Sequence, residues 1–261
     1  MGMQNASEFA FNPDPWIEPV YEPSLRFLEA FDEFDSRLRS LQRYFYFASQ
    51  FVERHLVKTQ ISLRRFDDPK YLAETEKALL EGAIGTPYED LVSYDAAAAE
   101  GYFSDMAAAD EEYFTEYLTG SIISHLFSLV EGLLSGVADD VAARLGQTVE
   151  LPSKPMPYIN KYVAYLQRDC GLSLTIDRAT WKAIDAIRAI RNRYVHRLNQ
   201  DLPQEIQLQL QKLIESAEQP EFEVNNSFVH TAFSTIGSVA TKLDLAYWSF
   251  VDSQEQQAGA Q

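Results

Sequence analysis

The chain has 261 residues, of which 46% are hydrophobic and 13% aromatic, and it carries a formal net charge of -17. This composition supplies a sizeable core, and the acidic balance excludes a general polyanion-binding protein, so nucleic-acid binding would need a local basic patch. The single cysteine, Cys170, excludes a disulfide framework and a cysteine-based zinc site; it is expected to be a buried apolar side chain in a cytoplasmic protein. Neither a signal peptide nor a transmembrane helix is expected, because the N-terminus lacks a basic segment and no apolar run reaches about 18 residues.

Residues 1–23 contain four prolines and are predicted to be an extended or disordered arm. If the arm is ordered, its aromatic residues are expected to dock on the body of the protein; these are Phe11, Trp16 and Tyr21. Ser24 is predicted to be the N-cap of a long helix over 25–60, whose apolar residues recur mostly at three and four positions.

A shorter helix is predicted over 70–82, and the acidic, alanine-rich residues 88–118 favour one or two further helices. Their carboxylates follow no calcium-loop or Glu-x-x-His pattern, so a solvated acidic face is preferred and no metal or cofactor is expected. Residues 24–103 are predicted to form an N-terminal helical region that packs on the helices of the rest of the chain.

A strong helix is predicted from Tyr113 to Leu145, closed by Gly146. Glu131 stands within its apolar run, either as a surface residue between buried turns or as the partner of a buried cation, for which Arg191 is the preferred residue.

The rest of the chain is also predicted to be helical, which makes the fold all-α. A helix over 158–169 ends at Gly171, and Asp177 is expected to cap the next helix. Further helices are predicted over 203–216 and 222–251, and a disordered tail over 254–261.

The helix that follows Asp177 has an unusual pattern. At about 100° per residue, its apolar side is formed by Ile184, Ile187, Ile190 and Tyr194. Arg191 falls within this apolar sector, and Asn192 and His196 share a face at its border because they are four residues apart. A guanidinium in such a position needs a charged or hydrogen-bonding partner.

Arg191, Asn192 and His196 form an Arg-Asn-x3-His pattern at the end of an amphipathic helix, and this pattern resembles the motif of the HEPN superfamily. The resemblance covers roughly residues 104–253, where the order of helices is similar and the helix with Glu131 matches the one that carries an acidic residue. It implies a four-helix up-and-down bundle, here with additional N-terminal helices.

The resemblance also implies a metal-independent endoribonuclease that works as a homodimer, typically a toxin restrained by an antitoxin or an antiviral-defence effector. In that function Arg191, Asn192 and His196 are the catalytic residues. The flanking arginines Arg188, Arg193 and Arg197 are expected to bind RNA, with Glu131 and Tyr194 in supporting positions.

Two alternatives stay open. A cationic helix end also complements the helix dipole, so the arginines need not contact RNA. Many HEPN domains are noncatalytic, so a binding or scaffold protein that recognises a protein, a nucleotide or RNA is the second reading.

Overall fold

The computed structural model describes residues 17–63, 96–196 and 226–259, together with positions 70, 77 and 81. The elements in this part of the chain are all helices: α1 (Glu29–Leu63), α3 (Ala96–Leu145), α4 (Tyr158–Arg168), α5 (Arg178–His196) and α7 (Asn226–Gly259). The all-α prediction is therefore confirmed. The chain forms two compact units, one of Trp16–Phe45 with Thr119–Gln261 and one of Met1–Pro15 with Tyr46–Leu118.

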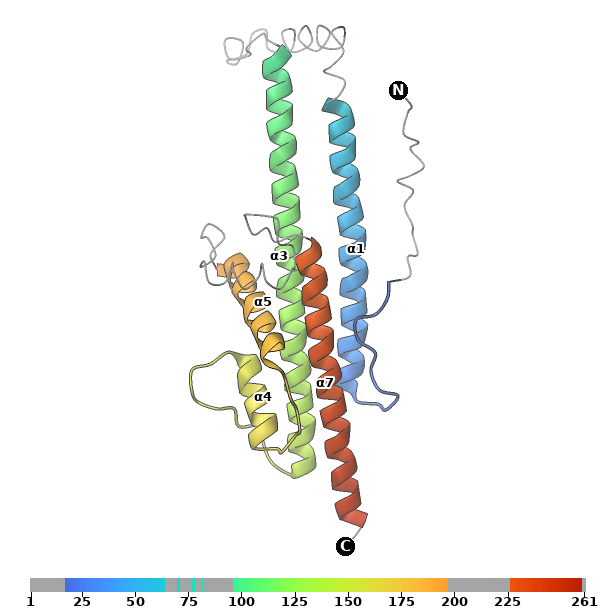
Figure 1. Ribbon diagram of the computed structural model, residues 1–261, viewed down its shortest axis with the longest axis vertical. Coiled ribbons are helices and arrows are strands. Elements are labelled where there is room, and N and C mark those ends of the chain that lie inside the picture. Colours follow the sequence, from blue (N-terminus) through green and yellow to red (C-terminus); the bar gives the residue numbers. More distant parts are fainter. Residues whose placement is uncertain are drawn as a thin grey trace. The chain divides into compact units, whose positions relative to one another are not determined.

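The unit of Trp16–Phe45 and Thr119–Gln261 is built around α3 and α7. In this unit α4 and α5 lie on one side of the two helices, and the start of α1 lies on the other (Figure 1). Tyr247 of α7 joins three of these helices: its ring packs edge-on against Phe31 of α1, with centroids 5.8 Å apart, and its hydroxyl donates to Asp140 of α3 at 2.6 Å. Burial and the Asp140 carboxylate raise the pKa of Tyr247 to about 12.

α3 and α7 each bury one apolar face, at the edge of which Leu129 of α3 is half-buried. The α3 face comprises Ile122, Leu126, Val130, Leu133 and Val137, and the α7 face comprises Phe228, Phe233, Ile236, Val239, Leu243, Tyr247 and Phe250. Cys170 is a buried free thiol, as expected. The three-and-four spacing thus identifies the core sides of both helices.

Glycines end two of the helices at the predicted places. Gly146 has a φ of 65°, and the N–H groups of Gly146 and Gln147 donate to the carbonyls of Ala143 and Ala142, which is the Schellman pattern. Gly171 follows α4 with a φ of 75°. Both positions lie in the left-handed region, where a residue without Cβ has no steric penalty.

The prediction of Ser24 as the N-cap of the first long helix is wrong. The helix begins at Glu29, and the Leu28 carbonyl accepts the N–H of Phe31 at 3.0 Å. Ser24 is used elsewhere, because its N–H and hydroxyl donate to the Asp244 carboxylate of α7 at 2.8 and 3.2 Å. A buried carboxylate requires such donors, and this requirement outweighs the local capping preference.

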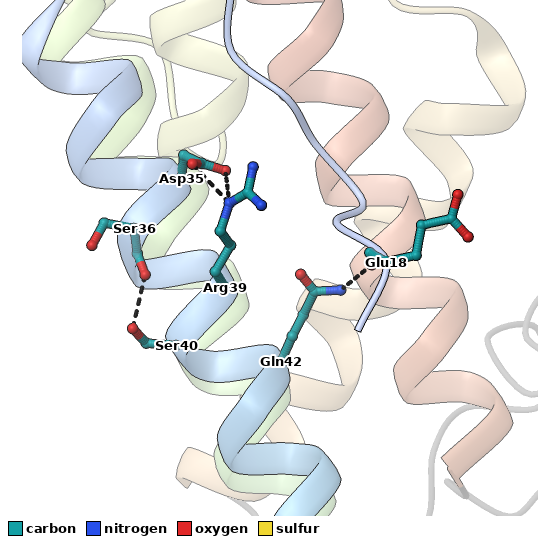
Figure 2. A network of polar contacts seen from close by, with 6 residues as sticks. All are labelled: Glu18, Asp35, Ser36, Arg39, Ser40 and Gln42. Atoms are coloured by element: carbon teal, nitrogen blue, oxygen red, sulfur yellow. Dashed lines mark hydrogen bonds and ion pairs between the residues drawn. The ribbon is translucent and has the colours of Figure 1, made fainter. Parts of the chain in front are cut away.

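Residues 17–28, which we call the N-terminal strap, pack on α7 and α1. Tyr21 is buried against Phe34 and directs its hydroxyl to Asp244 at 3.4 Å; burial and this carboxylate raise the pKa of Tyr21. The amide of Gln42 donates to the backbone carbonyl of Glu18, as Figure 2 shows. The predicted docking of Tyr21 is confirmed, whereas Phe11 and Trp16 lie outside the described residues.

Two helix boundaries differ from the prediction. In place of separate helices before and after Tyr113, α3 is continuous from Ala96, since its alanine-rich start contains no proline. The predicted disordered tail is helical up to Gly259, because α7 meets no proline after Val251. The predicted helix over 203–216 lies outside the described residues, and so do most positions of the one over 70–82.

One described helix segment, Tyr117–Leu145 of α3, is long and apolar enough to cross a membrane by length and composition, with a mean hydropathy of 1.5. This qualifies the expectation that no such segment exists. Half of its apolar window is buried inside the protein, as in the central helix of a bundle, so that half packs in the core.

Candidate functional site

The helix that carries the motif, α5, is fixed at its N-terminus by Asp177. The carboxylate accepts the N–H and the hydroxyl of Thr180 at 2.9 and 2.8 Å, which confirms the predicted cap. Lys242 of α7 adds an ion pair at 2.6 Å. The Lys242 ammonium and the Thr180 donors hold the pKa of Asp177 well below its usual range, so this connection between α5 and α7 is charged at neutral pH.

The apolar side of α5 faces the core. Its buried residues are Ala183, Ile184, Ala186, Ile187 and Ile190. Arg191, the residue after Ile190, is half-buried, in agreement with its position inside the apolar sector. The core packing of α5 therefore brings a guanidinium to the boundary between α5 and α3.

Arg191 is held from two sides. Its Nη1 donates to Oδ1 of Asn192 at 3.1 Å, and its guanidinium carbon lies 6.0 Å from the centre of the buried Phe127 ring on α3. The Nε–H is withdrawn from solvent and finds no acceptor among the described residues. Asn192 thus orients the Arg191 guanidinium through one N–H group, and most of the five guanidinium donors stay unused by Asn192.

Glu131 lies on α3, one turn from Phe127, and is half-buried. Burial raises the pKa of the Glu131 carboxyl, and the positive charge of Arg191 lowers it by a smaller amount, so the pKa stays above its ordinary value. The described residues contain no ion pair within 4 Å between the two side chains. Arg191 is therefore the cation that acts on Glu131, but at longer range than a direct salt bridge.

Tyr194 packs its ring on Gly120 of α3. A Cβ built on Gly120 would lie 2.5 Å from Cγ of the Tyr194 ring, so only glycine permits this approach. The contact fixes the last turns of α5 against α3, next to Arg191 and Asn192.

The other residues of the predicted site have fewer described contacts with Arg191 and Asn192. Arg188 is half-buried and bonds Asp185 at 3.1 Å on its own helix, and Arg193 is also half-buried. His196 is the last residue of α5, one turn after Asn192, but its side chain lies outside the described residues, as does all of Arg197. The structure thus brings together Arg191, Asn192 and Tyr194 at the end of α5 with Glu131 on α3.

No protein-family model, curated protein or solved structure matches the chain. The site geometry includes two residues that were not predicted from the sequence, Phe127 and Gly120. A signal was present, because positions 120, 127 and 131 are separated by seven and four residues and share one helix face.

Glu131→Gln is expected to stabilise the protein at pH 8. Folding raises the pKa of the Glu131 carboxyl above its unfolded value of about 4.3. Below the unfolded pKa this group does not lower the free energy of unfolding; as the pH rises through the folded-state pKa, stability is lost. The neutral amide avoids that loss, so the difference in melting temperature should shrink toward zero at pH 4. Thermal unfolding between pH 4 and 8 measures it, with the exposed Glu150→Gln as the matched control. A lower melting temperature for Glu131→Gln at pH 8 would mean that attraction to Arg191 outweighs burial.

Proposed function

We propose that the protein is a metal-independent endoribonuclease of the HEPN type, with Arg191, Asn192 and His196 as its catalytic residues. The observation that carries the proposal is the half-buried Arg191 guanidinium, oriented by Asn192 and Phe127 with N–H donors left for an anion. A guanidinium presents donors in a fixed fork that matches two phosphate oxygens.

In the proposed reaction, the ribose 2′-oxygen attacks the adjacent phosphorus while the P–O5′ bond breaks. One imidazole takes the 2′-hydroxyl proton, and a second delivers a proton to the departing 5′-oxygen. The products are a 2′,3′-cyclic phosphate and a 5′-hydroxyl, so atoms and charge balance without an added reactant. Arg191 stabilises the charge that develops on the phosphoryl oxygens.

Each chain provides one motif histidine, whereas the reaction uses an acid and a base. A homodimer with the two motifs face to face supplies both groups. A nuclease of this kind must be restrained in its own cell, so a toxin with an antitoxin partner, or an effector of antiviral defence, is the biological setting that we propose.

The test is incubation of the purified protein with mixed cellular RNA in EDTA. We expect wild-type protein to leave 2′,3′-cyclic phosphate ends and His196→Ala to leave none. His125→Ala is the matched control, because His125 is an exposed histidine whose ring nitrogen contacts the Ser121 carbonyl of its own helix. If all three proteins cleave equally, or none cleaves, the catalytic assignment is refuted and the noncatalytic binding protein becomes the better proposal.

A further inference from the structure

A groove of about 900 Å³ runs between α1 and α3, within the unit that also holds the motif. Its walls are residues 28–44 of α1 and 121–140 of α3. At 1.5 Å per residue, the α3 wall is about 29 Å long, which is the length of a helix of about 18 to 20 residues.

The bottom of the groove is apolar, and α1 and α3 approach each other closely there. Phe34 and Leu133 are buried in the floor, and a Cβ built on Gly136 would lie 2.9 Å from the Ala30 methyl group, so α1 and α3 nearly touch there. Gly132 is different, because it is exposed and a Cβ on it would meet nothing within 4 Å. A binding partner therefore has open space over Gly132 and apolar surface beneath.

The groove and the motif occupy different faces of α3. Residues 120, 127 and 131 face α5, whereas 125, 132 and 136 line the groove. At about 100° per residue, these two sets point more than 100° apart. A molecule in the groove would leave Arg191 and its surroundings uncovered.

The charges identify the kind of partner. Glu29, Glu33 and Asp140 line the end of the groove next to the Ala30–Gly136 contact. Asp140 is paired with Arg144 and accepts the Tyr247 hydroxyl, and Glu33 is paired with the exposed Arg37, so Glu29 and Glu33 are the carboxylates that face a partner there. The acidic surface of a second copy, with its net charge of -17, would meet like charge at this end of the groove, whereas a basic segment would be attracted to it.

We propose that this groove binds an amphipathic helix of a partner protein, with its apolar side over Gly132 and its basic residues over Glu29 and Glu33. Apolar side chains at every third or fourth position of the partner fill the space between the two walls. The proposal does not depend on the ribonuclease function.

The probe is a labelled helical peptide of about 18 residues, with leucine and alanine on one side and lysines at one end. A second peptide has the same apolar side and glutamates in place of the lysines. We expect saturable anisotropy for the lysine peptide, about 10-fold weaker binding of the glutamate peptide, and weaker binding at higher salt. The double variant Glu29→Gln, Glu33→Gln should reduce the preference for lysine.

Gly132→Phe fills the groove in a position where its Cβ has room, so the protein is expected to fold. It should weaken binding of the lysine peptide about 10-fold or more. Gly259→Phe is the control, since Gly259 is the other described helical glycine with nothing within 4 Å of a built Cβ. Absence of saturable binding, equal binding of both peptides, or an unchanged affinity in Gly132→Phe would each refute the proposal. So would sedimentation showing that Gly132→Phe dissociates a homodimer, because the occupant would then be a second copy.

Discussion

For the proposed ribonuclease, replacing Arg191 with lysine is expected to lower the rate of RNA cleavage by about 100-fold or more, which is the effect of losing one oriented donor to a developing oxyanion. Lysine retains the positive charge but not the planar fork. The Arg191 guanidinium is oriented by a 3.1 Å bond to Asn192 and by the Phe127 ring, and neither contact can orient an ammonium in the same way. The loss should appear in single-turnover cleavage at saturating protein.

Arg178→Lys is the matched control for this substitution. Arg178 lies at the other end of α5 and is exposed, so its replacement should change cleavage by less than about threefold. Circular dichroism and thermal unfolding must show that Arg191→Lys remains folded. If Arg191→Lys cleaves as fast as the wild type, only the charge of Arg191 is used and its fixed geometry has no role in the reaction.

The helix ends that the sequence predicted correctly are those determined by neighbouring residues. Asp177 bonds Thr180 three positions later, and Gly146 adopts the left-handed conformation next to the carbonyls that it satisfies. Such signals are local and can be read without knowledge of the fold. The buried faces of α3, α5 and α7 could be read for a similar reason, because a helix repeats its apolar side every three or four residues.

The start of α1 could not be read in this way. Ser24 has the residue type and the position of an N-cap, but it bonds Asp244, which lies 220 residues away in the chain. The Tyr21 hydroxyl donates to the same carboxylate. The arrangement depends on burial of Asp244 in α7, a property of the assembled unit that no short stretch of sequence contains.

The candidate site depends both on local sequence signals and on the packing of the assembled unit. The position of Arg191 in an apolar sector follows from helical periodicity, and the structure places it half-buried beside α3. Its long-range interaction with Glu131 and its contact with Phe127 depend on how α3 and α5 pack. α3 thus has a face against α5, a core face against α7 and a third face that forms the groove with α1.

Gly120→Ala is expected to lower the free energy of unfolding by about 1–3 kcal/mol, the usual range for an overpacked core position. The added methyl group would lie 2.5 Å from Cγ of Tyr194, near the base of the ring, where rotation of the side chain gives little relief. Either the last turns of α5 move away from α3 or the ring leaves its place. Urea unfolding followed by circular dichroism measures the change.

Gly132→Ala is a matched control on the same helix. Nothing lies within 4 Å of a Cβ at Gly132, so alanine should stabilise α3 by up to about 1 kcal/mol through helix propensity alone. A second test repeats Gly120→Ala in a Tyr194→Ala background. With the ring removed, the methyl group has room, and the substitution should become neutral or stabilising. If Gly120→Ala destabilises both backgrounds equally, the Tyr194 ring is not the group that requires glycine at position 120, and the end of α5 is held against α3 by other contacts.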